Sequence, residues 1–298
     1  MSATQSSLTT VAGVDDVRAA VRSARQGGRR VGFVPTMGAL HDGHAGLIRA
    51  ARAECDVVVV SCYVNPLQFG AGEDLDRYPH TPDADAAIVG GAGADLLWRP
   101  AHADLHGRGP DHGVRVLAGP LGGVLEGAAR PGHFDGVATV VTQLLGAVEP
   151  DVLYLGAKDY QQLLVLRRVV AGLLLDVDVR AVETVREPDG LARSSRNTML
   201  APAQRAAASS VPRALQAAQE LARSGERSAS ELRSAAVDVL ATEPLIDVDY
   251  VVVADPESLM PLDQIAHAAR MLVAVRIGST RLIDNVPLPP PAPRKIEP

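Results

Sequence analysis

The sequence contains few cysteines, few aromatic residues and few lysines. Its 298 residues include two cysteines, and Phe, Trp and Tyr together make up 3%. Cys55 and Cys62 flank one predicted strand, which suits buried thiols in a reducing compartment better than a disulfide framework. Because 47% of the residues are hydrophobic, the chain can still bury a large core. Its length suits one large domain or two modest ones, and we expect two.

Long apolar runs and basic runs are also missing. No segment approaches the roughly 20 consecutive apolar residues of a membrane-spanning helix, and the N-terminus lacks a signal-peptide pattern. We therefore expect a cytoplasmic protein with no membrane partner. The formal net charge is −6, and no Lys/Arg cluster offers the basic surface that non-specific nucleic-acid binding requires, so we expect no nucleic-acid partner.

Lysine occurs at two positions, Lys158 and Lys295, and Lys295 lies in the proline-rich tail. Lys158 is thus the one lysine within the predicted domains. In a chain that otherwise uses arginine, a remaining lysine can mark a position that needs a compact ammonium group. Chance, taken alone, is the better explanation of a single lysine.

Apolar runs and amphipathic segments alternate along the first part of the chain. This order predicts an α/β fold with a doubly wound, Rossmann-like parallel sheet that binds ligands at the carboxyl ends of its strands. The expected strands cover residues 31–34, 57–64, 96–98, 152–155 and 177–185, and the helices between them include 14–24 and 160–172.

The pattern changes after residue 185. Two helices, 203–223 and 228–241, precede strands near Val248, Leu272 and Leu282. We therefore predict a nucleotide-binding domain over 1–185, a smaller α+β lid domain over 186–286 and a disordered tail over 287–298, whose prolines cannot build a core.

His41 and His44 stand three residues apart where a glycine turn leads from the first predicted strand into a helix. Two imidazoles and the unpaired N–H groups of a helix N-terminus form an anion site that suits an α-phosphate under attack. A helix cap with two solvated histidines explains the spacing equally well. A zinc site does not, because the remaining ligands are missing, and the sequence contains neither a P-loop nor a complete dinucleotide fingerprint.

Two further segments follow predicted strands at the same sheet edge. Asn65 and Gln68 offer uncharged amides suited to hydroxyl and carboxylate groups, although an ordinary turn is the better explanation of that segment alone. Lys158 is placed to hold β- and γ-phosphate oxygens, Asp159 to bind a metal or cap a helix, and Gln162 to reach a substrate.

Polar residues also gather in two loops. Ser194, Ser195 and Arg196 offer hydroxyls and a guanidinium that could clamp a triphosphate, unless the segment is a flexible linker. Arg130 precedes a helix and offers a fixed positive charge to a carboxylate or phosphate. His102, His106 and His112, with Asp104 and Asp111, suggest a metal cluster, but a solvated surface loop explains them better.

Taken together, these segments resemble the pantoate–β-alanine ligases, a family of the HIGH-motif nucleotidyltransferase superfamily. The resemblance runs in order through nearly the whole chain. It rests on the segments 35–44, 64–69, 77–79, 130–137, 158–162, 189–192, 194–197 and 281–285.

The resemblance implies an ATP-dependent ligase that condenses pantoate with β-alanine to pantothenate. Pantoate would attack the α-phosphorus of ATP to give pantoyl adenylate and diphosphate, and the β-alanine amine would then displace AMP. The family is typically a cytoplasmic homodimer, and Mg²⁺ would accompany ATP without a firmly assigned protein ligand.

The resemblance also implies roles for individual residues. His44 would be the proton donor, and His41, Lys158 and Arg196 would share the catalytic work. The expected ATP site comprises Met37, Gly38, His41, Gly43, His44, Gly156, Lys158, Asp159, Val185, Ser194, Ser195 and Arg196. Pantoate would bind Gln68 and Gln162, with Asn65 and Arg130 nearby.

Four residues depart from the family pattern, namely Tyr63, His80, Ala157 and Arg193. In addition, Gly46 weakens the helix that starts at the histidines by about 1 kcal/mol relative to alanine.

A related enzyme that transfers AMP or CMP to a phosphorylated acceptor is the closest alternative function. Its acceptor pocket should be cationic, whereas Gln68 and Gln162 are neutral. A catalytically silent nucleotide-binding regulator is a third hypothesis.

Overall fold

The computed structural model describes residues 8–70, 73, 75–107 and 113–290. The chain divides into two compact units, Met1–Val185 and Arg186–Pro298. Each unit has its own hydrophobic core and is described separately. Residues 291–298, which make up most of the predicted proline-rich tail, lie outside the described residues.

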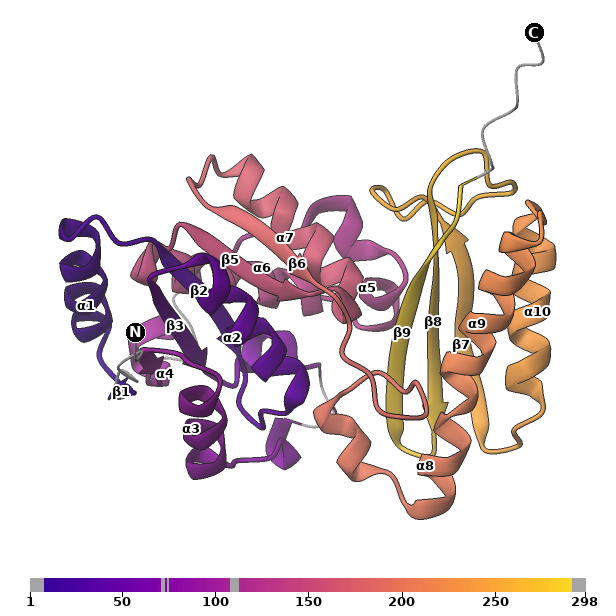
Figure 1. The fold of residues 1–298 in the computed structure, drawn as a ribbon, viewed down its shortest axis with the longest axis horizontal. Helices are drawn as coiled ribbons and strands as arrows, with labels where there is room; N and C mark the ends of the chain where they lie inside the picture. The colour runs from indigo at the N-terminus through magenta and orange to yellow at the C-terminus, as the bar shows by residue number, and fades with distance from the viewer. Residues whose placement is uncertain (1–7, 71–72, 74, 108–112, 291–298) are drawn as a thin grey trace, which may run out of the picture. The chain divides into compact units, whose positions relative to one another are not determined.

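The first unit alternates strands with helices (Figure 1). Its strands are β1 (Thr9–Val11), β2 (Val31–Thr36), β3 (Val57–Cys62), β4 (Leu96–Trp98), β5 (Val152–Gly156) and β6 (Asp178–Val182). Its α-helices are α1 (Val14–Gln26), α2 (Asp42–Glu54), α3 (Pro82–Gly91), α4 (His102–His106), α5 (Glu126–Ala129), α6 (His133–Val148) and α7 (Tyr160–Gly172). Short 3₁₀ segments are η1 (Pro66–Gln68), η2 (Leu75–Arg77), η3 (Gly119–Gly123) and η4 (Ala157–Asp159).

The six strands form one parallel sheet in the order β1-β4-β3-β2-β5-β6. From β2 the chain winds outward to β3 and β4, and it then returns to the other side of β2 to form β5 and β6. Ligands of open α/β sheets bind at the carboxyl ends of the strands where the winding reverses. Here that point lies between β2, which leads to His41, and β5, which leads to Lys158. The predicted doubly wound α/β fold is confirmed.

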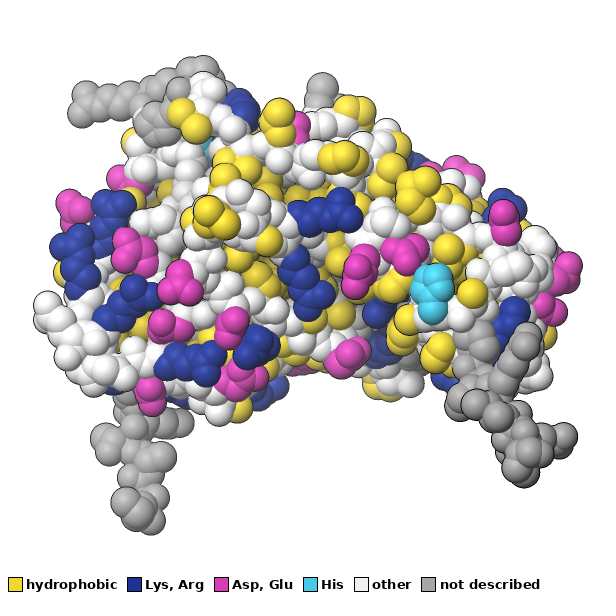
Figure 2. All heavy atoms as spheres, turned by 90° about the horizontal axis from the view of Figure 1, so that it is seen from above, with side chains coloured by type: hydrophobic (Ala, Val, Ile, Leu, Met, Phe, Trp, Pro, Cys, Tyr) yellow, Lys and Arg dark blue, Asp and Glu magenta, His cyan; other side chains and the backbone are white. Residues whose placement is uncertain are grey.

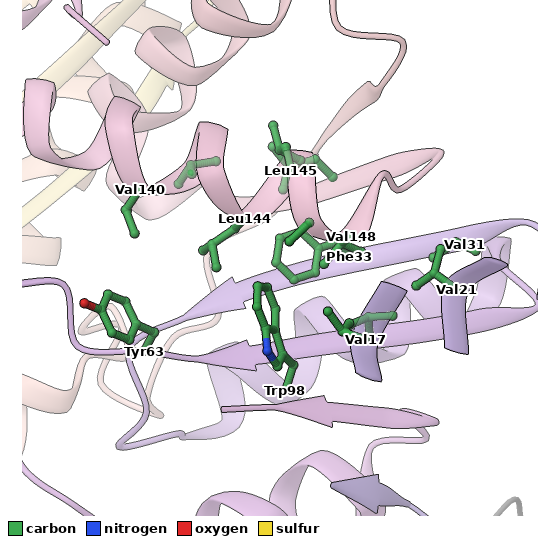
Figure 3. Close-up of a cluster of buried hydrophobic side chains, with 14 of the residues drawn as sticks. Val17, Val21, Val31, Phe33, Tyr63, Trp98, Val140, Leu144, Leu145 and Val148 are labelled. Atoms are coloured by element: carbon green, nitrogen blue, oxygen red, sulfur yellow. The ribbon is translucent and has the colours of Figure 1, made fainter. Parts of the chain in front are cut away.

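Alternate residues of the central strands pack on opposite faces of this sheet. Val57 and Val59 belong to the cluster that contains the buried face of α6, whereas Val58 and Val60 belong to the cluster that contains α2. Figure 3 shows the α6 side chains Leu144 and Val148 directed toward Trp98 and Phe33 of the sheet. Burial on both faces explains why the β3 segment is a continuous β-branched run rather than an alternating one.

The second unit packs two long helices against an antiparallel sheet (Figure 1). Its elements are η5 (Ser195–Met199), α8 (Pro202–Ala208), α9 (Ser210–Arg223), α10 (Ala229–Ala241), β7 (Ile246–Ala254), β8 (Ala269–Ile277) and β9 (Thr280–Leu288). Leu215 of α9 and Leu232 of α10 are buried with Met271 and Val273 of the central strand β8. This is the predicted smaller α+β fold.

Several element boundaries differ from the sequence prediction. The edge strand β1 was not predicted, because three residues give too little periodicity. The helix expected over 203–223 is two helices, since Pro212 in the first turn of α9 has no N–H to donate to the preceding turn. The tail begins later than predicted, because Pro287 and Leu288 belong to β9 and pair with β8.

The surface carries mixed charge. On the face shown in Figure 2, Lys and Arg side chains are interspersed with Asp and Glu side chains. Such a distribution differs from the single basic patch of a nucleic-acid-binding surface. None of the helices in the part of the chain that the structure describes has the length and apolar character needed to cross a bilayer.

Candidate active site

The turn between β2 and α2 holds an unusual backbone conformation. Gly38 has a φ of 84° and Ala39 a φ of 50°, which is costly for a residue with a side chain. Thr36 Oγ1 accepts a hydrogen bond from the Gly38 N–H at 3.3 Å and donates to the Ser61 carbonyl at 2.7 Å. The end of β2 therefore ties the turn to β3.

Asp85 of α3 stabilises the same turn and was not predicted as a site residue. Its carboxylate accepts hydrogen bonds from the N–H groups of Ala39 at 3.2 Å and Leu40 at 2.8 Å, and from the Thr81 hydroxyl at 3.0 Å. The side chain is buried. A sequence signal did exist, because Asp85 stands four residues before Val89 on the buried face of α3, where a carboxylate needs partners.

His41 and His44 form a reciprocal cap at the start of α2. His41 Nδ1 accepts the N–H of Gly43 at 3.1 Å, and His44 Nδ1 accepts the N–H of His41 at 3.2 Å. The ring centroids lie 4.2 Å apart. Because Nδ1 of each neutral ring is an acceptor, the ring proton is on Nε2. The two interpretations of the histidines are thus compatible. Nδ1 of each ring accepts a backbone N–H at the helix N-terminus, and Nε2–H of each ring can donate to an anion.

His44 is uncharged at neutral pH. Burial and, after it, the neighbouring His41 lower its pKa to about 3, while Asp159 raises this pKa and Lys158 lowers it. The charges of Lys158 and Asp159 therefore act on His44, although these residues are more than a hundred positions away in the chain. An uncharged His44 is a hydrogen-bond donor through Nε2 rather than an imidazolium ion.

Lys158 and Asp159 lie in η4, directly after β5. Lys158 Nζ donates to Asp159 Oδ1 at 3.2 Å, and the lysine side chain is 18% exposed. Asp159 occupies the N-cap position of α7, but its side chain makes no capping hydrogen bond. The plain-cap interpretation of Asp159 is therefore not supported, and its carboxylate accompanies the lysine instead.

Gln68 is directed toward the histidine turn. Its Nε2 lies 2.9 Å from Met37 Sδ, and its Oε1 accepts a hydrogen bond from Asn65 Nδ2 at 3.1 Å. Asn65 itself is buried, donates also to the Gly136 carbonyl at 3.1 Å and accepts from the Leu67 N–H at 3.2 Å. These bonds occupy the asparagine amide, so Asn65 orients Gln68 rather than facing a ligand.

Arg130 is engaged by a partner that the sequence did not suggest. Its Nε donates to Glu73 Oε1 at 2.7 Å, and its Nη2 donates to Glu73 Oε2. This pair lowers the pKa of the Glu73 carboxyl, chiefly through the hydrogen bond from Arg130. Arg130 also donates to the Gln68 carbonyl at 3.3 Å. Glu73 therefore competes with a substrate anion for the Arg130 guanidinium, for which the sequence predicted a direct contact.

The paired glutamines of α7 differ in their surroundings. Gln161 is buried, donates to the carbonyls of Leu121 at 2.7 Å and Val124 at 2.8 Å, and accepts from the Glu126 N–H at 3.1 Å. It therefore holds the segment before α5. Gln162 is only partly buried, which leaves it the better ligand candidate of the two.

Val185 packs closely against Gly46 of α2. A Cβ on Gly46 would lie 3.2 Å from Val185 Cγ2, so the glycine lets α2 lie close to the chain after β6. The predicted weakness of the helix at Gly46 thus accompanies a packing contact. It brings Val185 beside the helix that carries the histidines.

In the second unit, Ser194 to Arg196 belong to an ordered segment rather than a flexible linker. Ser194 Oγ accepts the Arg196 N–H at 3.3 Å as the cap of η5. Asn197 Nδ2 donates to Glu187 Oε1 at 2.8 Å and to the Ala192 carbonyl at 3.1 Å. Burial raises the pKa of the Glu187 carboxyl, but hydrogen bonds from Arg205 and Asn197, together with the charges of Arg205 and Arg193, bring this pKa below its usual value. Arg193 is one of the departures from the family pattern.

The segment predicted as a solvated histidine loop is partly helical. α4 carries His102 and the buried His106, and His102 Nδ1 lies 3.1 Å from the Tyr63 hydroxyl. Tyr63, another departure from the family pattern, therefore has a hydrogen-bond partner in α4. Among the described residues no His/Cys/Asp/Glu group could hold a metal ion, and Asp111 and His112 lie outside them. Nothing in the structure explains His80, and Ala157 is simply buried.

The chain is similar to known proteins over almost its whole length. The family model described as pantoate-beta-alanine ligase matches residues 9–287. The pantothenate synthetase of Pelotomaculum thermopropionicum is 49% identical over 272 residues, which cover 91% of this chain and 96% of that protein. A solved pantothenate synthetase from Thermus thermophilus has a TM-score of 0.89 at 46% identity and covers 94% of this chain and 99% of its own.

A solved pantoate-beta-alanine ligase from Francisella tularensis, complexed with beta-gamma ATP and beta-alanine, is also similar. Its TM-score is 0.77 at 32% identity, with coverage of 94% of this chain and 97% of its own.

Proposed function

The chain belongs to the pantoate–β-alanine ligase family, and on this premise we propose how its residues carry out the reaction. It is an ATP-dependent ligase that condenses pantoate with β-alanine to form pantothenate. Our proposal concerns the pantoyl-adenylate route and the roles of individual side chains.

In the first step, a carboxylate oxygen of pantoate attacks the α-phosphorus of ATP, and diphosphate leaves. The protein must then orient the two reactants and stabilise the charge that develops on the phosphate oxygens, without a nucleophilic side chain of its own. We assign this stabilisation to Nε2–H of His41 and His44, the Lys158 ammonium group and the Arg196 guanidinium. The observation that carries the assignment of His41, His44 and Lys158 is that the neighbouring strands β2 and β5, where the sheet reverses its winding, lead directly into the histidine turn and into η4. Arg196 is assigned from the family resemblance.

The remaining ATP contacts are assigned from the family resemblance. They are Met37, Gly38, Gly43, Gly156, Asp159 and Val185 in the first unit, and Ser194 and Ser195 in the second. In the second step the β-alanine amine attacks the acyl carbon of pantoyl adenylate, the acyl–phosphate bond breaks, and AMP leaves with the bridging oxygen.

We assign pantoate binding to Gln68 and Gln162. Gln68 is supported by its fixed side chain beside Met37, and Gln162 by its partly exposed position next to the fully engaged Gln161. Asn65 and Arg130 are proposed to act through Gln68.

Magnesium is proposed to enter with ATP. Because the described residues contain no cluster of metal-binding side chains, the triphosphate oxygens would supply most of the ligands. Asp159, whose side chain is 48% exposed, is the carboxylate best placed to add one. When bound, the ion would neutralise charge on the leaving diphosphate. A homodimer in the cytoplasm, which the family resemblance implies, stays a prediction.

Incubation with ATP, pantoate and β-alanine tests the proposed route. We expect AMP and pantothenate to form in equal amounts, and AMP release to fall sharply when β-alanine is omitted. AMP release that does not depend on β-alanine would overturn the two-step ligase route and favour simple nucleotidyl transfer.

Lys158→Ala tests the phosphate site in the same assay. We expect pantoate-dependent exchange of labelled diphosphate into ATP to fall by about 100-fold or more, with Lys158→Arg recovering a part. If the parent protein shows no exchange activity and Lys158→Ala only weakens ATP binding, the protein is a nucleotide-binding regulator rather than an enzyme.

A further inference from the structure

The segment from Arg130 to Gly136 contacts the backbone of Gln68 at several points. His133 Nδ1 lies 2.8 Å from the Gln68 carbonyl oxygen, and Arg130 Nη2 lies 3.3 Å from the same oxygen. A Cβ on Gly136 would lie 2.2 Å from the Leu67 carbonyl oxygen and 2.7 Å from the Gln68 nitrogen, so the start of α6 reaches η1 only because this residue is glycine. These three residues, Arg130, His133 and Gly136, are called the α6 platform.

The hydrogen bonds of the platform run in one direction. The Gln68 carbonyl can only accept, so His133 donates through Nδ1–H, and its Nε2 is left to accept from Arg130 Nη1 at 3.1 Å. This arrangement requires an uncharged imidazole. Burial, reinforced by the positive charge of Arg130, lowers the pKa of His133 to about 4 and keeps it in that form.

Glu73 completes the arrangement. It holds Arg130 through two parallel hydrogen bonds, and both side chains are largely buried, at 25% and 17% exposed. A guanidinium held in this way is oriented by the protein before any substrate arrives, and its charge is already neutralised.

We propose that Glu73, Arg130 and His133 are positioning residues for pantoate recognition, which act through the backbone of Gln68 rather than by contact with the substrate. Fixing the Gln68 carbonyl leaves its side chain to be set by Asn65 and Met37, so the amide faces the substrate in one orientation. The inference rests on the proposed assignment of Gln68 to pantoate.

The two possible roles of Arg130 predict opposite effects of Glu73→Gln. If Arg130 contacts pantoate directly, weakening its partner releases positive charge and lowers the KM for pantoate. If Arg130 positions Gln68, the same change loosens the guanidinium and raises that KM, with the KM for ATP unchanged.

A double-mutant cycle between His133 and Gln68 tests the proposal in the intact enzyme. We expect His133→Ala to raise the KM for pantoate about tenfold, with a smaller change in kcat, because a donor to Gln68 is lost. His133→Asn should recover most of the loss, since the asparagine Nδ2 can replace the Nδ1–H donor. In a Gln68→Ala background, His133→Ala should change the KM for pantoate less than about twofold.

The outcomes separate the pantoate assignment from the positioning role. Gln68→Ala with an unchanged KM for pantoate overturns the pantoate assignment itself. A strong effect of Gln68→Ala combined with an additive or absent effect of His133→Ala overturns the positioning role. Circular dichroism and the KM for ATP of each variant distinguish loss of positioning from loss of the fold, and failure of His133→Asn to recover pantoate affinity in a folded variant also counts against the proposal.

Discussion

The carboxylate of Asp85 lies 2.8 Å from the backbone nitrogen of Leu40 and accepts its hydrogen. With a second bond from Ala39, it holds the turn in a conformation in which the φ of Ala39 is 50°, which is strained for a residue with a side chain. α3 therefore shapes the turn at the start of the histidine helix.

Asp85→Asn should destabilise the protein and weaken ATP use together. One acceptor becomes a donor that faces backbone N–H groups, which costs about 1–3 kcal/mol. Urea unfolding gives the free energy, and kcat/KM for ATP gives the functional effect. Asp83→Asn, at an exposed position on the same helix, is the control and should stay within about 0.5 kcal/mol of the parent. Equal effects of both changes would show that Asp85 acts only through helix charge.

His44→Asn should separate the structural role of His44 from its catalytic role. The asparagine oxygen can still accept the His41 N–H that His44 Nδ1 accepts at 3.2 Å, so the cap should survive. The Nε2 donor is lost, and we expect kcat to fall by about 100-fold or more. His44→Ala should lose the same activity and, in addition, about 1 kcal/mol of stability. Substantial activity in a stable His44→Asn enzyme would argue against a phosphate contact from Nε2.

Acid should destabilise the protein through His44 and His133. Their pKa values, about 3 and about 4, lie below the usual 6.5 because burial disfavours the charged imidazole. Between those values and pH 6.5 the unfolded chain binds more protons, so stability falls as the pH falls, by up to about 1.4 kcal/mol per pH unit for each group. Urea unfolding at pH 7, 6 and 5 measures the slope, which His133→Asn should reduce. An imidazole signal of either residue that titrates near pH 6.5 in NMR spectra would contradict this expectation.

Gly136→Ala should disrupt the contact between α6 and η1. The added Cβ meets backbone atoms of Leu67 and Gln68, which cannot rotate away, so a cost of about 1–3 kcal/mol and a raised KM for pantoate are expected. Gly146→Ala on the same helix has open space around its Cβ and should be neutral or stabilising by up to about 1 kcal/mol. Thermal unfolding and pantoate titrations compare the pair, and matching stabilities would refute the close approach at Gly136.

Arg186→Ala should destabilise the second unit. The Asp284 side chain is 1% exposed and accepts two hydrogen bonds from Arg186, at 2.6 and 3.0 Å, so removing the arginine leaves a buried charge at a cost of about 3 kcal/mol. Arg276→Ala removes a more exposed partner of Asp249, which Arg281 also holds, and should cost at most about 1 kcal/mol. Comparable losses in urea unfolding would mean that burial does not decide the strength of these pairs.

The sequence by itself determined the fold class and the family, and it predicted which segments follow the strands at the ligand-binding edge of the sheet. The β-branched run after Asp56 and the apolar spacing of α6 and α7 are local patterns, so they predicted buried parallel strands and covering helices. His41, His44 and Lys158 follow predicted strands, and the topology rule for parallel sheets brought them to one edge.

Tertiary structure alone decided which polar residues of these segments are held by partners within the protein. Asp85, Glu73 and Gln161 find their partners 35 to 57 residues away, and hydrogen bonding at such separations leaves no periodic pattern to detect. Arg130 illustrates the consequence. Its motif indicates a free cation beside a substrate, but the fold places Glu73 against it, and a buried guanidinium binds the nearest carboxylate because an unpaired buried charge is too costly.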